Sequence, residues 1–331
     1  MNPKPKFAMY WASACGGCEI AVLNTHEKIL EVDANFEIVF WPVAMDAKYK
    51  DLEAMEDGSI LLTLFNGSMR NHENEEIAHL LRRKSKILVS FGSCATEGCI
   101  PGLANLSPAG EIVQTAFHTI TTDSFEGNAP QLSYKTPDGT LTLPEMNSRV
   151  KTLAQVVDVD YFMPGCPPES HQISDVIDLV IQVINGKAEL PPKGSVIGAG
   201  NSTVCDECPR SRNIKLITKF HRIQDIAPLD PQLCVLEQGI PCNGPATRSG
   251  CNARCPRVGA QCIGCYGAAE GVIDYGARLI TAFASVIDAN DPGQIETILD
   301  GIPDPAGQFY RFNLADSLLR TGKSSWHKNG N

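Results

Sequence analysis

Thirteen cysteines are the residues of this 331-residue sequence whose type and spacing could do chemistry. In the first half, Cys15 and Cys18 form a Cys-Gly-Gly-Cys run, and Cys94 and Cys166 each follow a glycine-containing turn. Eight more lie between residues 205 and 265. In a reducing compartment, cysteines serve as thiols, catalysts or metal ligands rather than as structural disulfides. The number and grouping of these cysteines therefore indicate metal binding.

The four cysteines of the first half are expected to meet at one edge of a parallel sheet. The expected strands and the cysteines that follow them are 7–12 with Cys15 and Cys18, 86–91 with Cys94, and 160–163 with Cys166. In open α/β sheets, ligands bind beyond the carboxyl ends of the strands, and four thiolates suit a 4Fe–4S cluster. A thioredoxin-like redox pair would explain the Cys-Gly-Gly-Cys run but not Cys94 or Cys166. Zinc, which also accepts four thiolates, remains an alternative.

The eight cysteines of the second half divide into two sets of four. They are Cys205, Cys208, Cys234, Cys242, Cys251, Cys255, Cys262 and Cys265. Two structural zinc sites could use eight thiolates. We favour clusters, because several clusters in one chain make a path for electrons, whereas three zinc sites would share no purpose.

The elements that must position these cysteines alternate between strands and helices over the first 190 residues. Besides the strands above, the pattern predicts strands over 36–43 and 59–65 and helices over 19–32, 73–83 and 169–185. Such alternation is typical of a parallel sheet covered on both faces. We therefore predict an α/β fold with a flavodoxin-like, doubly wound parallel sheet. An insertion at about 108–150 interrupts it, with a hairpin around Pro137-Asp138-Gly139.

A linker at Pro191-Pro192-Lys193-Gly194 separates this domain, residues 1–190, from a second domain, residues 191–331. Residues 195–270 show little periodicity and many glycines and prolines, so we expect an irregular iron–sulfur cluster domain without an ordinary apolar core. Such a segment would need metal cross-links to offset its loss of chain entropy. A helix is predicted over 273–287.

Composition and charge limit the environment of the protein. Apolar residues make up 43% and charged residues 20%, as in ordinary globular proteins. The net charge of −10 argues against nucleic acid and anionic membranes as partners. The longest apolar run, 176–184, contains Asp178 and Gln182 and is too short to span a bilayer. With no targeting segment in view, we expect a cytoplasmic protein.

Several motifs occur in a fixed order along the chain. In the first domain they are Cys15-Gly-Gly-Cys18-Glu19, Gly92-Ser93-Cys94-Ala95, Ile100-Pro101-Gly102-Leu103-Ala104-Asn105 and Pro164-Gly165-Cys166-Pro167-Pro168. In the second they are Cys205-Asp-Glu-Cys208-Pro209-Arg210, Leu236-Glu237-Gln238-Gly239, Gly244-Pro245-Ala246-Thr247-Arg248 and Cys262-Ile-Gly-Cys265-Tyr266-Gly267. Together they resemble the small subunit of nickel–iron hydrogenases. The most similar type is the cytosolic, methyl-viologen-reducing one that works with heterodisulfide reductase.

The resemblance implies three 4Fe–4S clusters, each with its own four cysteines. The implied sets are Cys15, Cys18, Cys94 and Cys166 for a proximal cluster, Cys251, Cys255, Cys262 and Cys265 for a medial one, and Cys205, Cys208, Cys234 and Cys242 for a distal one. The chain would relay electrons between the active site of a large subunit, which oxidises or produces H2, and a flavin-bearing or ferredoxin-like partner. In the periplasmic branch of the family a histidine stands near position 205 and the medial set has three cysteines, so this chain departs from that branch.

Other residues near the cysteines carry weaker expectations. The family usually has glycine where Cys99 stands; we expect a buried, small apolar residue, with a ligand exchange with Cys94 as the alternative. Glu19 is a candidate proton carrier at the subunit interface, or a carboxylate stabilised by a helix N-terminus. Glu97 is expected to be a structural hydrogen-bond acceptor. Three histidines are expected to be non-ligands: His118, His171 and His221.

A basic stretch lies close to the predicted distal set. It consists of Arg210, Arg212, Lys215, Lys219 and Arg222. It is either a docking patch for an acidic electron-transfer partner or a solvated face.

Two other functions stay open. One is the cluster-bearing subunit of a quinone oxidoreductase of the complex I type, and the other is a ferredoxin-like carrier not tied to an enzyme. Exposed apolar surface near the proximal cysteines would count against a free carrier.

Overall fold

The computed structural model describes residues 3–119, 129–213 and 216–319. Its first part is built on a five-stranded sheet in the order β2-β1-β3-β5-β9, in which every neighbouring pair is parallel. The strands are β1 (Lys6–Trp11), β2 (Glu37–Phe40), β3 (Ile60–Asn66), β5 (Ser85–Phe91) and β9 (Tyr161–Met163). This is the flavodoxin-like order, with the first strand inside the sheet. The predicted fold class and all five strands are confirmed.

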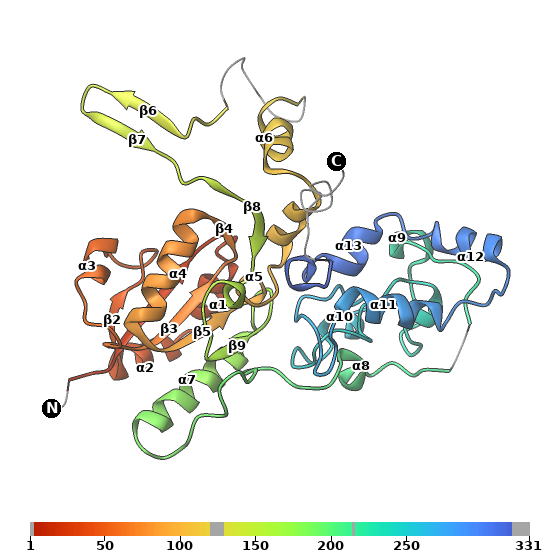
Figure 1. The fold of residues 1–331 in the computed structure, drawn as a ribbon. Coiled ribbons are helices and arrows are strands. Elements are labelled where there is room, and N and C mark those ends of the chain that lie inside the picture. Colours follow the sequence, from red (N-terminus) through yellow and green to blue (C-terminus); the bar gives the residue numbers. More distant parts are fainter. Residues whose placement is uncertain (1–2, 120–128, 214–215, 320–331) are drawn as a thin grey trace.

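Helices cover both faces of the sheet (Figure 1). Successive side chains of a strand point to opposite faces, and both sets are apolar here, so each face is buried under helices. In β1, Phe7 and Met9 pack with α1 (Gly17–Leu23), α2 (Lys28–Asn35) and α7 (Ser170–Ile184). Ala8 and Tyr10 pack with α3 (Tyr49–Glu53) and α4 (His72–Lys84) on the other face. Burial on both faces explains why these strands appear as continuous apolar runs in the sequence.

The helix predicted over 19–32 is two helices, α1 and α2, because the chain turns between them. His26 has a φ of 54°, in the left-handed region that ends a right-handed helix. The short helix α3 was not predicted, whereas α4 and α7 were.

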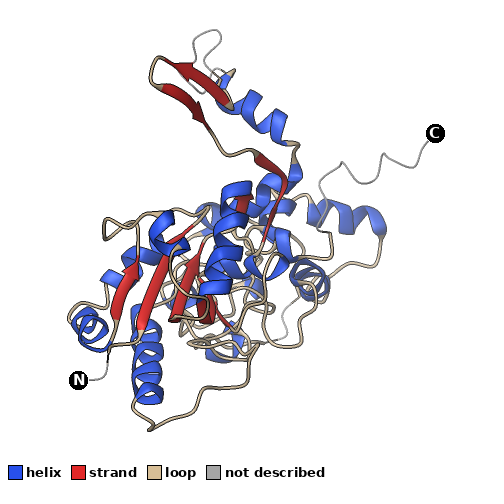
Figure 2. Cartoon of the chain, turned by 60° about the vertical axis from the view of Figure 1, so that its left-hand side comes forward, coloured by secondary structure: helices blue, strands red, loops and turns tan. Residues whose placement is uncertain are grey.

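The insertion forms an arm that projects from the body of the molecule (Figures 1 and 2). It comprises α6 (Ala109–Phe117), the hairpin of β6 (Ser133–Thr136) and β7 (Gly139–Thr142), and β8 (Met146–Lys151), which pairs antiparallel with β4 (Met69–Asn71). The predicted hairpin is confirmed. Two cross-strand pairs, Leu132 with Leu143 and Tyr134 with Leu141, share one face of it. All four side chains are more than half exposed.

The second part of the chain consists of short helices joined by irregular loops. The α-helices are α8 (Val204–Glu207), α9 (Ile223–Ile226), α10 (Arg254–Arg257), α11 (Tyr275–Ala284), α12 (Pro292–Leu299) and α13 (Pro305–Tyr310). The second part also contains the 3-10 helices η3 (Leu236–Gln238) and η4 (Leu314–Asp316), and the first part contains α5 (Ser93–Thr96), η1 (Ile100–Leu106) and η2 (Leu153–Gln155).

This part has an apolar core, contrary to our expectation. Phe220, Leu236, Ile240 and Phe283 are among its buried side chains. Phe283 lies in α11, Leu236 lies in η3 and the other two lie in loops, so the sequence shows no periodicity although the structure buries them together. Cys242 and Cys262 belong to the same core.

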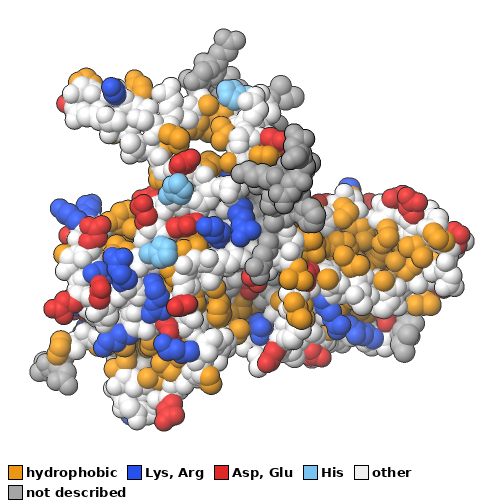
Figure 3. Space-filling model, viewed as in Figure 1, with side chains coloured by type: hydrophobic (Ala, Val, Ile, Leu, Met, Phe, Trp, Pro, Cys, Tyr) orange, Lys and Arg blue, Asp and Glu red, His pale blue; other side chains and the backbone are white. Residues whose placement is uncertain are grey.

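Two features of the surface concern membranes and partners. No helix in the described ranges is long and apolar enough to cross a bilayer. Hydrophobic side chains gather over α12 and α13 in Figure 3, where Ile295, Leu299 and Ile302 help to line an open groove of about 710 Å³.

Candidate metal centres

The four cysteines of the predicted proximal set lie beyond the carboxyl ends of three strands of the sheet. Cys15 lies in the turn from β1 into α1, Cys18 lies in the first turn of α1, Cys94 lies in α5 directly after β5, and Cys166 lies in the loop after β9. Cys18 and Cys94 are buried, whereas Cys15 and Cys166 are exposed. The sequence correctly predicted their place on the sheet.

These four thiols are close enough to affect one another's ionisation. Burial raises the pKa of Cys18, and the charges of Cys94, Glu19, Cys166 and Cys15 raise it further. The backbone comes close to the sulfurs as well, because a Cβ at Gly92, where φ is +81°, would lie 2.3 Å from Cys18 Sγ. Only glycine fits this cradle.

Cys99 lies beside this set, although its spacing belongs to none of the three. It is fully buried, as predicted, and its Sγ donates to Cys166 Sγ at 3.6 Å. Hydrogen bonds to Cys166 and Cys94 and burial raise the pKa of Cys99, and the bond from Cys99 lowers the pKa of Cys166 to about 7. Its φ of 46° favours glycine. Whether it can replace a ligand stays a prediction.

Glu19 lies in the first turn of α1 and is only 3% exposed. Its Oε2 accepts a hydrogen bond from Asn66 Nδ2 at 2.9 Å, and Oε1 has no partner in the described structure. Burial raises the pKa of this carboxyl group. A protonatable carboxyl therefore lies next to Cys18, and its role in proton transfer stays a prediction.

Glu97 accepts a hydrogen bond from Thr96 Oγ1, which agrees with its expected structural role. Burial raises the pKa of its carboxyl group to about 8. A Cβ at Gly267 would lie 2.2 Å from Glu97 Oε1, so glycine allows this carboxyl to reach the loop after Cys265.

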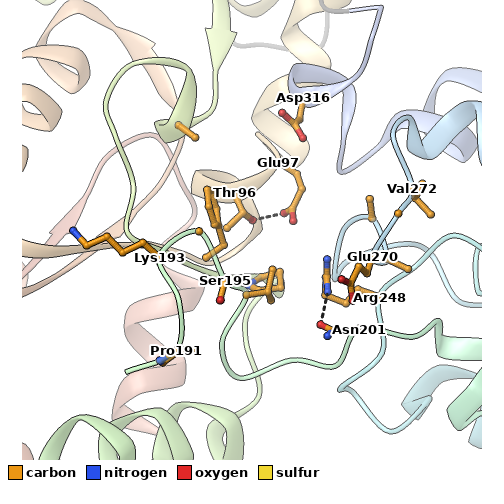
Figure 4. A pocket seen from close by; sticks show the side chains of 18 residues that line it. Thr96, Glu97, Pro191, Lys193, Ser195, Asn201, Arg248, Glu270, Val272 and Asp316 are labelled. Carbon is orange, nitrogen blue, oxygen red and sulfur yellow. Dashed lines mark hydrogen bonds between the residues drawn. The ribbon is translucent and has the colours of Figure 1, made fainter. Parts of the chain in front are cut away.

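A cleft of about 830 Å³ runs between the sheet and the second part of the chain (Figure 4). Thr96 and Glu97 line one side, and Asn201, Arg248 and Glu270 line the other. The cleft therefore lies between the loops that bear the proximal and medial cysteines, and its charges are mixed.

The predicted medial set lies in α10 and in the loops before and after it. Cys255 lies in α10, Cys251 precedes it, and Cys262 and Cys265 follow. Burial raises the pKa of Cys265 to about 12, and Cys251, Cys166 and Cys255 contribute to the rise. Three medial thiols thus lie near one another, and one of them lies near the proximal set.

The predicted distal set spans α8 and the loops around η3. Burial raises the pKa of Cys205 to about 11, and nearby Cys234 and Cys208 raise it further. A Cβ at Gly244 would lie 3.0 Å from Cys205 Sγ and 3.9 Å from Cys242 Sγ. The backbone N–H of Cys262 donates to Cys242 Sγ at 3.3 Å, so the distal and medial sets are adjacent. The three sets follow one another in the order proximal, medial, distal.

The two parts of the chain are joined by hydrogen bonds beside the proximal and medial cysteines. Ser93 Oγ donates to the carbonyl oxygen of Cys265 at 2.6 Å and accepts from the N–H of Gly165 at 3.1 Å. Tyr266 donates to Gln172 in α7, whose amide donates to the carbonyl of Gly250. These residues were missed, because no local pattern reveals a contact between positions 172 residues apart.

The basic stretch is not one surface patch. Arg210 is 9% exposed, and its guanidinium donates to the carbonyls of Pro256, Asp230 and Leu233. Arg212 is directed at Cys205. Lys215 lies outside the described residues, whereas Lys219 and Arg222 are exposed. Among the described residues, Lys219 and Arg222 remain candidates for a docking patch.

The donor sets fit iron–sulfur clusters in their chemistry, because each offers four thiols, and glycines allow close backbone approach to sulfurs of the proximal and distal sets. In the described ranges, no three His, Cys, Asp or Glu side chains are grouped so that they could hold one metal ion. A cubane distributes its thiolates over four iron atoms, so its ligands need not converge on one ion. His118, His171 and His221, all within the described ranges, belong to no such group.

Comparisons with known proteins show the family of the chain. Residues 15–180 match the family described as "NADH ubiquinone oxidoreductase, 20 Kd subunit". The iron-sulfur subunit of the F420-non-reducing hydrogenase of Archaeoglobus profundus is 38% identical over 95% of this chain and 97% of its own. The F420-non-reducing hydrogenase subunit of Methanothermobacter marburgensis is 34% identical over 96% and 97%. The NiFeSe hydrogenase of Desulfovibrio vulgaris Hildenborough shares the fold at 17% identity, with a TM-score of 0.51 over 80% of this chain and 94% of that one.

These findings define an oxidoreductase subunit with the α/β domain of the 20 kDa NADH–ubiquinone oxidoreductase type. More narrowly, the chain belongs to the family of hydrogenase small subunits that includes these two subunits of F420-non-reducing hydrogenases. The predicted resemblance is confirmed. The match to full-length relatives, second part included, sets the chain apart from a complex I subunit.

Proposed function

We propose that this chain is the electron-transfer small subunit of a cytosolic nickel–iron hydrogenase whose active site lies in a partner large subunit. It relays electrons to or from a flavin-bearing or ferredoxin-like protein, such as heterodisulfide reductase, through three 4Fe–4S clusters. The clusters supply one-electron, outer-sphere transfer. The chain's own residues bind them, exclude water and set their spacing.

The observation that carries this proposal is an apolar rim around exposed thiols. Cys15 and Cys166 are exposed, and three large apolar side chains on the neighbouring β1, α1 and η1 are exposed too: Trp11 by 39%, Ile20 by 57% and Ile100 by 48%. A cluster held there needs a cover, and apolar surface of this kind marks protein interfaces. This counts against a free carrier and supports a large subunit at the proximal end.

The proposed ligands are the twelve cysteines in three sets. The proximal set is Cys15, Cys18, Cys94 and Cys166; the medial set is Cys251, Cys255, Cys262 and Cys265; the distal set is Cys205, Cys208, Cys234 and Cys242. The medial set lies near the proximal set at Cys265 and is adjacent to the distal set at Cys262, which supports a path for electrons from the apolar rim to the distal end. The groove beside α12 is a second apolar surface and supports contact with a further protein.

The name of the full-length relatives supports the choice of acceptor. They are subunits of hydrogenases named as not reducing F420, so a protein acceptor rather than F420 suits this chain.

The proposal is tested by purifying the chain anaerobically from its native source with its partners. We expect about twelve iron atoms and twelve sulfides per chain, one nickel-bearing large subunit, and reduction of the clusters by H2. A stable monomer with intact clusters and no partner in native mass spectrometry would support the free carrier instead. Two or three zinc ions with almost no iron would overturn the cluster assignment.

A further inference from the structure

The guanidinium of Arg212 lies against two sulfurs of the proposed distal set. Its Nη2 donates a hydrogen bond to Cys205 Sγ at 3.2 Å. The charge of Cys205 raises the pKa of Arg212, against the effect of burial, and Cys234 adds to the rise. In return, the charge of Arg212 counteracts the rise that burial causes in the pKa of Cys205.

This contact differs from those of the other sulfurs. Cys15 Sγ accepts from the backbone N–H of Gly17 at 3.4 Å, and Cys242 Sγ accepts from the backbone N–H of Cys262. Within the described part of the chain, Arg212 supplies the one cationic side chain that donates to a cysteine sulfur. The nearby Arg210 instead donates to backbone carbonyls and holds the loops together. Arg212 is therefore directed at the site, whereas Arg210 serves the fold.

A positive charge at this place has a direct electrostatic effect. Reduction adds one negative charge to an iron–sulfur cluster, and a neighbouring cation with a hydrogen bond to a ligand sulfur favours that reduced form. The charge at Arg212 is permanent, because guanidinium stays protonated in proteins. Its side chain is exposed, so the charge lies at the surface end of the set.

We propose that Arg212 raises the reduction potential of the distal cluster, so that electrons collect at the surface end of the path. This inference rests on the proposed function. In the step concerned, one electron leaves the medial cluster, which is oxidised, and enters the distal cluster, which is reduced. No proton moves and no bond to the protein forms or breaks. Arg212 thus acts on the cluster through its positive charge and its hydrogen bond to Cys205.

The test is a redox titration of the complete, anaerobically purified complex with mediator dyes, followed by electron paramagnetic resonance. Arg212→Gln should lower the midpoint potential of one cluster so that its reduced-to-oxidised ratio at a fixed potential falls about tenfold, which corresponds to about 59 mV for one electron. The signal that shifts should be the one that Cys205→Ser alters. Arg212→Lys, which keeps a positive charge, should restore most of the potential. Arg83→Gln, at an exposed arginine of α4, is the matched control, and its potentials should equal those of the unmodified complex.

The outcomes separate this inference from the proposed function. If Arg212→Gln keeps its iron and all midpoint potentials are unchanged, the inference is wrong and the proposed function stands. If Arg212→Gln loses the distal cluster, the Arg212→Lys variant decides. A distal cluster at the potential of the unmodified complex in Arg212→Lys supports a role for charge. An intact distal cluster in Arg212→Lys whose midpoint potential is lower by about 59 mV contradicts that role. Absence of cluster signals in the unmodified complex would overturn the proposed function itself.

Discussion

At the scale of single residues, a mutation of Cys99 tests whether this cysteine is a ligand of the proposed proximal cluster. It touches Cys166 at 3.6 Å, yet its backbone is in the left-handed region. We expect Cys99→Gly to keep about twelve iron atoms per chain and to unfold at the same temperature or slightly above, because glycine relieves the strain at that φ. Iron analysis and a thermal melt measure both.

Cys94→Ser is the matched variant and should lose iron. A loss of about four iron atoms from Cys99→Gly, with Cys94→Ser unaffected, would mean that Cys99 is the ligand.

Arg210 and Arg222 should respond differently to mutation although both belong to the basic stretch. Arg210→Met leaves three backbone carbonyls without their donor, so we expect the free energy of unfolding to fall on the order of 3 kcal/mol. Arg222→Met should change it by less than about 0.5 kcal/mol, because the side chain is exposed. Denaturant titration compares the two.

Docking should depend on Lys219 and Arg222, two exposed cations of the basic stretch. Charge reversal of Lys219 together with Arg222 should weaken binding of the acceptor protein most strongly at low salt. Lys86→Glu, at the amino end of β5, is the control. Equal binding by both variants would leave the stretch as a solvated face.

The sequence predicts the positions of the first-half cysteines on the sheet well, because chemical type and spacing mark them, whereas their role as ligands stays a prediction. Cys15, Cys94 and Cys166 could be placed at strand ends without a structure. The roles of Ser93, Arg212 and Tyr266 could not be predicted, because each depends on a neighbour that only folding supplies. Serine, arginine and tyrosine are common residues, and nothing local marks these three.

At the scale of elements, the contact between α5 and the loop after Cys265 should make stability depend on pH. Glu97, at the end of α5, has a pKa raised to about 8 by burial. Because the folded-state pKa lies above the ordinary value, the neutral carboxyl stabilises the fold, and this contribution is complete below about pH 4.5 and lost as the pH rises through about 8.

Glu97→Gln keeps the shape and stays neutral. Its melting temperature should therefore vary less between pH 5 and 8 than that of the unmodified protein. Gly267→Ala, which crowds the same carboxyl, should melt lower at every pH. Parallel pH profiles for Glu97→Gln and the unmodified protein would show that the carboxyl does not titrate in this range.

The predictability of the elements follows from where each has its apolar contacts. The sheet strands pack against regular helices on both faces, so each strand appears in the sequence as a short apolar run. The break at His26 and the core around Phe220 and Phe283 depend on single dihedral angles and on converging loops, which leave no periodic trace.

At the scale of the whole molecule, removal of iron should affect the two parts unequally. The sheet has two apolar cores of its own, whereas the core of the second part includes Cys242 and Cys262. After anaerobic chelation of iron, we expect residues 204–270 to be cleaved first by a protease and the sheet to stay protected from hydrogen exchange.

The loaded protein is the control and should resist cleavage in both parts. Simultaneous loss of protection in β3, β5 and the second part would mean that the chain unfolds as one unit, and our division of stability would be wrong.

The projecting hairpin of β6 and β7 has a consequence for how the cell must make this protein. Both of its strands are edge strands, and one face carries Leu132, Tyr134, Leu141 and Leu143 uncovered. Free edges beside apolar surface recruit further strands from other copies and lead to aggregation. Chains synthesised in excess of their partner would be lost to aggregates or proteases, so balanced synthesis of the subunits matters as much as the supply of iron.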